Sequence, residues 1–167
     1  LNNDVEIITE NWLEEMLQLC QQKDVGMAGA KLYYPDDTIQ HAGVVVGLGG
    51  VAAHVLCKLP RDAEGYMGRL RCVQEISAVT AACMMVKTSV FKAVGGFDEE
   101  LKVAFNDIDL CMKVRKYGVK IVFTPYAELY HYESKSRGME DTPEKQLRFS
   151  REVNCFRRKW ERELQIG

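Results

Sequence analysis

Strand-like apolar runs alternate along this chain with helix-like segments that carry their own start and stop signals. Residues 25–34 (VGMAGAKLYY) are typical of a buried strand, and the turn sequence Pro-Asp-Asp follows them directly. Residues 106–118 place apolar side chains at one-face helical spacing and end in Gly118. Chains in which strands and helices alternate fold as layers of helices packed on a sheet. We therefore predict an α/β fold.

The other elements follow from the same signals. Further strands are expected over residues 38–46, 120–123 and 127–132, the last two separated by Pro125, with one or two more in 73–86. Helices are expected after Thr9 or Asn11 as far as about residue 22, after Thr88 or Ser89 as far as Gly95, from Asn106 as its cap, and over about 143–164 with Thr142 as its cap. Residues 47–68 are expected to form a loop.

Composition limits the classes of protein to which the chain can belong. With 167 residues, 47% of them hydrophobic and 28% charged, residues 1–167 suit one globular domain. The formal net charge of −2 gives no overall basic field, so nucleic acid is not an expected partner. The six cysteines are scattered without a CxxC pair, as in a cytoplasmic protein with reduced thiols. No apolar run reaches the roughly 20 residues of a membrane span.

Two acidic residues are candidates for chemistry, and each also has a purely structural interpretation. Asp107 falls in the first turn of the helix over 106–118, where the helix dipole favours an acid by about 0.3–1 kcal/mol. The same dipole keeps a carboxylate ionised, so that it can accept a proton from a sugar hydroxyl. Asp4 ends the sequence Asn2-Asn3-Asp4, which has ordinary turn chemistry but can also hold a divalent cation through oxygen.

His131 and the segment that follows it form a third candidate. His131 lies between Tyr130 and Tyr132 in a strand-like stretch, where a histidine is either a hydrogen-bonded core residue or a ligand. The next residues include Ser134 and Arg137 in a basic, hydroxyl-rich loop, which suits either a diphosphate or solvent.

The C-terminal helix carries many basic residues between apolar ones. We expect the apolar residues to pack on the body of the domain and the basic residues to form a solvated face. A second interpretation is peripheral contact with an anionic membrane or with a lipid-linked substrate.

Four segments, taken in order, resemble the C-terminal, acceptor-side part of a family 2 nucleotide-sugar glycosyltransferase with the GT-A fold. Residues 1–4 (LNND) resemble the metal-binding DxD motif with Asn as its first member, and residues 78–101 resemble the acceptor-side strand and helix that end in Gly-Gly-Phe-Asp. Residues 105–118 (FNDIDLCMKVRKYG) resemble the region of the catalytic base, and residues 130–138 (YHYESKSRG) the histidine and closing loop. The implied fold is a mixed sheet flanked by helices.

The resemblance implies a role for each candidate residue. Asp4 would bind Mn²⁺ or Mg²⁺ at the diphosphate of a nucleotide-sugar donor, with His131 as a further metal or diphosphate ligand. Asp107 would be the general base that activates a hydroxyl of a glycan or lipid-linked acceptor, with inversion at the anomeric carbon. Ser134 and Arg137 would secure the diphosphate in the closed loop.

The family's N-terminal half would hold the nucleotide, and residues 1–167 resemble only the acceptor-side portion of the domain. We therefore expect residues 1–167 alone to bind donor weakly and to transfer little sugar. An exposed sheet edge is also expected to favour a homodimer.

Two other functions remain open from the sequence. One is a noncatalytic glycan-binding or assembly protein that retains the fold, and the other is a nucleotidyltransferase with similar acid and metal chemistry. For an enzyme of polysaccharide biosynthesis, the expected location is the cytoplasm, at the inner face of the membrane.

Overall fold

The computed structural model describes residues 1–132 and 142–166. A mixed sheet runs in the order β1-β8-β2-β3, with β6 paired to β8 and β7 to β2. Its strands are β1 (Val5–Ile7), β2 (Val25–Tyr33), β3 (Ile39–His41), β6 (Gln74–Glu75), β7 (Met84–Val86) and β8 (Lys120–His131). β2 and β8 are parallel, and the other pairs are antiparallel. The predicted α/β class is confirmed.

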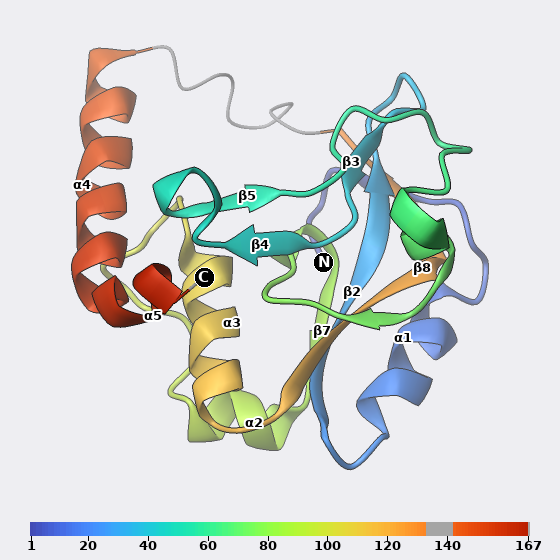
Figure 1. Cartoon of the computed structure of the whole chain (residues 1–167), viewed down its shortest axis with the longest axis horizontal. Helices are drawn as coiled ribbons and strands as arrows, with labels where there is room; N and C mark the ends of the chain where they lie inside the picture. Colours follow the sequence, from blue (N-terminus) through green and yellow to red (C-terminus); the bar gives the residue numbers. More distant parts are fainter. Residues whose placement is uncertain (133–141, 167) are drawn as a thin grey trace.

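Helices cover both faces of the sheet (Figure 1). They are α1 (Trp12–Cys20), α2 (Thr88–Ala93), α3 (Asn106–Lys116), α4 (Pro143–Lys159) and α5 (Glu161–Ile166). Short 3-10 turns lie at η1 (Leu48–Gly50), η2 (Tyr66–Arg71) and η3 (Ala81–Cys83), and β4 (Val44–Val46) pairs with β5 (Ala52–His54) in a separate ribbon.

The alternation of side chains along β2 divides the core in two. Ala28, Ala30 and Leu32 pack with Met16 of α1, because successive strand residues point to opposite faces. Tyr33 belongs to the cluster on the other face, which includes residues of α3 and α4. Both faces are therefore covered, and every residue of β2 is buried.

Two predicted interruptions differ from the structure. Lys120 to His131 form one strand rather than two, because the pairing with β2 shifts register between Gly29 and Lys31, where the partners change from Phe123 to Glu128. Pro125 has no N–H to donate, and it falls within this unpaired step. The C-terminal helix is interrupted at Trp160, which leaves the helical conformation (φ −116°, ψ 22°) between α4 and α5.

The predicted strand over 38–46 is in fact β3 and β4, which belong to different sheets. The chain turns at Gly43, where φ is +104° and a Cβ atom would lie 2.7 Å from Ile76 Cγ1. The predicted loop over 47–68 contains β5 and η1, because β5 finds a partner in β4.

The structure confirms the predicted cap of α4 and contradicts the predicted cap of α3. Thr142 caps α4, since its side chain accepts a hydrogen bond from the Lys145 amide at 3.3 Å. Asn106 is the first residue of α3 rather than its cap. Phe105 takes the cap position in a left-handed conformation (φ 62°), and its ring contacts Phe149 and Phe156. The cap residue therefore makes no side-chain hydrogen bond to α3 and instead packs its ring against α4.

Candidate active site

Asp4 and His131 are brought together by the pairing of β1 with β8. Val5 lies opposite His131, and the Tyr132 amide donates to the Asp4 carbonyl oxygen at 2.8 Å. Asp4 Oδ1 consequently lies 3.2 Å from His131 Nε2, with side chains that are 15% and 12% exposed. Two residues 127 positions apart in sequence share one half-buried site.

Gln40 of β3 fixes the orientation of the His131 ring. Its Nε2 donates to the His131 carbonyl oxygen at 3.3 Å, so its Oε1 faces His131 Nδ1 at 2.7 Å. An amide oxygen only accepts, so this contact assigns the proton to Nδ1 in the neutral ring. Nε2 then carries a lone pair, and the Asn2 side-chain amide lies 3.3 Å from it.

This tautomer leaves two acceptors facing each other at Asp4 and His131. Within the described part of the chain, Asp4 Oδ1 is buried and accepts no hydrogen bond. A carboxylate oxygen beside an imidazole lone pair is stabilised by a cation between them or by a proton on the ring. The arrangement fits a divalent cation, because a ligating histidine generally donates its other ring N–H to an oxygen acceptor, as His131 Nδ1 does to Gln40 Oε1.

The residues supply only part of a coordination sphere. In residues 1–132 and 142–166, no three His, Cys, Asp or Glu side chains are grouped so that they would hold a metal ion. One oxygen and one nitrogen ligand are in place, so the remaining ligands would have to come from a bound molecule or water.

Asp107 is held at the start of α3 by two backbone amides. Its Oδ2 accepts from the Ala81 amide at 3.1 Å, and its Oδ1 accepts from the Ile108 amide at 2.8 Å. A carboxylate has about four acceptor positions, so each oxygen keeps a lone pair for another partner. The Asp107 side chain is therefore oriented and still able to accept a proton.

The η3 turn connects Asp107 to the Asp4 and His131 pair. The Ala81 backbone N–H donates to the Asp107 carboxylate on one side of this turn. On the other side, the Ala82 carbonyl accepts from the backbone N–H of Asn2 at 3.0 Å. Asn2 in turn contacts His131. A continuous series of contacts thus brings together residues from the start of the chain, α3 and the end of β8.

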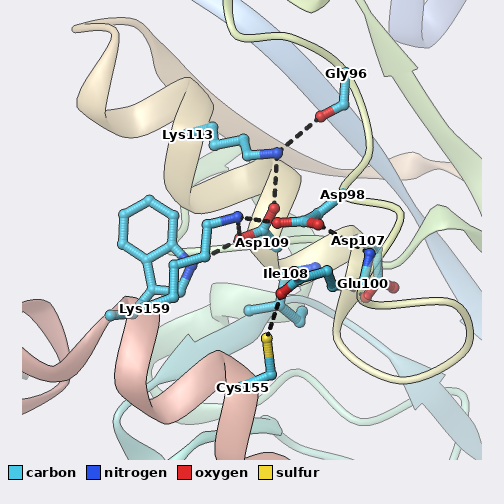
Figure 2. A network of polar contacts seen from close by, with 10 residues as sticks. Gly96, Asp98, Glu100, Asp107, Ile108, Asp109, Lys113, Cys155 and Lys159 are labelled. Carbon is cyan, nitrogen blue, oxygen red and sulfur yellow. Dashed lines mark hydrogen bonds and ion pairs between the residues drawn. The ribbon is translucent and has the colours of Figure 1, made fainter. Parts of the chain in front are cut away.

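Asp109, two residues after Asp107 on α3, anchors that helix to α4 (Figure 2). The side chain is fully buried, and its Oδ1 accepts from Trp160 Nε1 at 2.8 Å and lies 2.7 Å from Lys159 Nζ. Its Oδ2 lies 2.9 Å from Lys113 Nζ. Trp160 makes this contact at the position where the C-terminal helix is interrupted.

The same lysines extend the network to the Gly-Gly-Phe-Asp segment. Lys113 donates to the Gly96 carbonyl at 3.1 Å, and Lys159 also bonds to Asp98. Burial opposes the charge of Lys159, but its bonds to Asp109 and Asp98 outweigh burial and raise its pKa. The bond to Lys159 lowers the pKa of Asp98. This network fixes the base of α3, two residues from Asp107.

The sequence did not single out Gln40 or the network of Asp109. The i,i+4 spacing of Asp109 and Lys113 was a usable signal for an ion pair, although not for its burial. Gln40 lies 91 residues from His131 and carried no local signal. Ser134 and Arg137, predicted to hold the diphosphate, lie outside the described residues.

The structure also bears on the state of the cysteines and on the possibility of a membrane-spanning helix. All six cysteines are free, and Cys20, Cys83 and Cys111 are buried, as expected for reduced thiols. Across the described residues, no helix has both the length and the apolar character needed to cross a bilayer.

Comparison with known proteins identifies the family of the chain. Residues 3–151 match the family described as "Glycosyltransferase like family 2". An uncharacterized protein, y4gI of Sinorhizobium fredii (strain NBRC 101917 / NGR234), is 59% identical over 161 residues, which cover 96% of this chain and 18% of that protein. The O-antigen biosynthesis protein RfbC of Myxococcus xanthus is 38% identical over 145 residues, covering 86% of this chain and 11% of RfbC.

A third relative matches over a shorter stretch. The N-acetylglucosaminyl-diphospho-decaprenol L-rhamnosyltransferase of Mycobacterium tuberculosis is 36% identical over 62 residues, covering 37% of this chain and 20% of the enzyme. The chain thus spans a fifth or less of each of these relatives. The family match covers most of the chain, and the fold is a mixed sheet flanked by helices. The chain belongs to glycosyltransferase family 2 and has a GT-A-like fold.

Proposed function

We propose that this chain provides the acceptor-side catalytic residues of an inverting, metal-assisted transfer of sugar from a nucleotide-sugar donor. The observation that carries the proposal is the series of contacts from Asp107 through Ala81 and Ala82 to Asn2, His131 and Asp4. It joins a candidate proton acceptor to a candidate cation site across one short turn.

Asp107 is the general base in this mechanism. Its carboxylate accepts the proton of an acceptor hydroxyl as the hydroxyl oxygen forms a bond to the anomeric carbon of the donor sugar. The bond between that carbon and the phosphate oxygen breaks, and the nucleoside diphosphate leaves with the electron pair. Displacement from the opposite face inverts the configuration at the anomeric carbon.

Asp4 and His131 form the leaving-group end of the site. They would hold Mn²⁺ or Mg²⁺ through one carboxylate oxygen and Nε2, while Gln40 keeps the proton on Nδ1. The cation, when bound, supplies positive charge that stabilises the departing diphosphate.

The names of the relatives indicate the class of acceptor. One is an O-antigen biosynthesis protein, and another acts on N-acetylglucosaminyl-diphospho-decaprenol. We propose a glycan or lipid-linked acceptor for this chain as well. Contact of the basic face of α4 with a membrane at the cytoplasmic side, and formation of a homodimer, remain predictions.

Transfer by the whole protein that contains this chain tests the proposal. The protein is incubated with Mn²⁺, a panel of nucleoside-diphosphate sugars and a lipid-linked N-acetylglucosaminyl diphosphate, and the product is analysed by NMR. The expected product has the opposite anomeric configuration to the donor. A product of retained configuration contradicts inversion, and no transfer from any donor favours a noncatalytic glycan-binding protein.

A further inference from the structure

A large pocket opens beside the central strands, away from the residues of the candidate active site. Its volume is about 1000 Å³, and its walls come from β2, β8, the turn at Asp36 and Asp37, and the segment from Pro60 to Arg71. No residue of the Asp4, His131 and Asp107 series lines it. The pocket is therefore separate from the candidate active site.

Lys31 of β2 lines this pocket, and most of its side chain is buried. The residue is only 5% exposed, and within the described chain it forms no hydrogen bond or ion pair. Its Nζ lies 5.4 Å from the centre of the Tyr33 ring, which offers only a weak cation–π contact. An ammonium group at a pocket wall that makes no hydrogen bond or salt bridge in the described residues can receive an anion.

The acids around Lys31 are already engaged by other groups. Glu128 bonds to the Tyr33 hydroxyl through Oε1 and lies 3.3 Å from Arg61 Nη2 through Oε2. Asp37 accepts from the Tyr130 hydroxyl at 2.5 Å and from Arg61 at 3.4 Å. The strongest hydrogen bonds of both carboxylates are therefore directed away from Lys31.

The pKa of Lys31 agrees with this geometry. Burial lowers it below the ordinary value, the Glu128 carboxylate raises it in part, and Arg61 and Arg71 lower it further. The net effect is a lowered pKa, so the carboxylate nearby does not neutralise the lysine. An anion bound at Nζ would raise the pKa of Lys31.

The lining of the pocket restricts the kind of anion. Three cationic side chains line it against four carboxylates, a balance of 3 − 4 = −1, so the pocket disfavours a multiply charged phosphate more strongly than a singly charged carboxylate. Asp36 and Asp62 are exposed and can accept hydrogen bonds from sugar hydroxyls. Tyr126 is 52% exposed and presents an aromatic ring on which the apolar face of a sugar can pack.

We propose that this pocket binds a saccharide carrying a single carboxylate, with Lys31 Nζ as the partner of that carboxylate. The proposal rests on the proposed function in one respect, because it makes the saccharide part of the acceptor glycan. Binding itself requires neither donor nor metal, so it is measured separately from transfer.

NMR titration of the isotope-labelled chain with sodium glucuronate tests the proposal, with glucose and inorganic phosphate as the comparison ligands. We expect saturable shifts at the amides of Lys31, Arg61 and Tyr126 with glucuronate. Glucose should bind about tenfold more weakly or less, since it lacks the charged partner of the lysine. Equal binding of glucose, tighter binding of phosphate, or no saturable shift with glucuronate would each overturn the proposal.

Matched substitutions identify the residue responsible. Lys31→Met should weaken glucuronate binding by about tenfold or more, whereas Lys23→Met makes the same change at an exposed site outside the pocket and should leave it unchanged. Lys31→Met keeps most of the buried apolar stem and removes only the charged end, so the fold should be retained, and Lys31→Gln is a second variant that keeps a polar end. Unweakened binding in both Lys31 variants contradicts the assignment.

Asp107→Asn separates the two hypotheses. This variant should bind glucuronate as the unchanged chain does, because Asp107 does not line the pocket. In the unsubstituted protein, glucuronate binding without any sugar transfer would mean that the proposed function fails while the pocket assignment holds. Transfer without glucuronate binding would mean the reverse.

Discussion

Asp4 Oδ1 lies 3.2 Å from His131 Nε2, while Gln40 Oε1 occupies the opposite ring nitrogen at 2.7 Å. The two contacts leave a carboxylate oxygen close to a ring nitrogen that carries no proton in this tautomer, with the Asn2 side-chain amide 3.3 Å from the same nitrogen. Such a pair is a partial cation site built by the pairing of β1 with β8.

The Asp4 and His131 pair should bind Mn²⁺ in the presence of a nucleoside diphosphate. Paramagnetic broadening of NMR signals should be strongest at Asp4 and His131, and Asp4→Asn should lower the Mn²⁺ affinity by at least about tenfold, the scale on which even outer partners matter. Asp24→Asn is the matched control, because Asp24 precedes β2 at the end remote from the strand residues beside His131. Equal broadening in the Asp4 variant would remove this residue from the metal site.

Loss of Asp109 should destabilise the domain strongly. Asp109→Ala leaves Lys113 and Lys159 without their buried counter-charge, which should lower the free energy of unfolding by about 3 kcal/mol. The lysines are partly exposed, so the lower end of the usual range applies. Urea denaturation measures the change, and Trp160 fluorescence should shift to longer wavelength as α4 loosens.

Asp107→Ala is the control for that experiment, because Asp107 lies two residues earlier on α3 and accepts only backbone amides. Its cost should be about 1–2 kcal/mol for two lost hydrogen bonds. Equal costs for the two variants would show that the Asp109 network does not anchor α4.

Acid should destabilise the domain through His41. This fully buried ring faces His54, with 3.0 Å between their Nδ1 atoms, and also His131, and burial first and then these neighbours hold its pKa well below 6.5. The unfolded chain therefore takes up a proton that the folded chain excludes. The resulting stability is present above pH 6.5 and is lost below it, at up to about 1.4 kcal/mol per pH unit.

Urea unfolding of the wild type and of His41→Gln at a series of pH values checks this prediction. The variant should lose a large part of the pH dependence below 6.5. An identical slope in both proteins would show that His41 is not the group that takes up the proton.

Much of the fold was predictable because its signals are local. The continuous apolar run of β2 and the Gly118 stop of α3 follow from nearby residues alone. The single strand β8 was not predictable, because a register shift against β2 accommodates Pro125. The interruption at Trp160 likewise coincides with a bond to Asp109, which is 51 residues away.

The residues of the candidate site were likewise predicted only in part. Asp4, His131 and Asp107 were selected through resemblance to a family, and the structure brings Asp4 and His131 into contact while linking Asp107 to them through η3. Gln40 and Lys31 were missed, because their significance depends on partners, or on the lack of a partner, that only the folded chain reveals.

The central claim is that Asp107 is the base of a sugar transfer, and the transfer rate of Asp107→Asn tests it most directly. Nucleoside diphosphate release and glycosylated product are measured with the whole protein at saturating donor, with circular dichroism as the check on folding. We predict that kcat falls by about 10²–10⁴-fold with little change in KM for the donor. Unchanged turnover in the folded variant would contradict the role of Asp107 and the mechanism built on it.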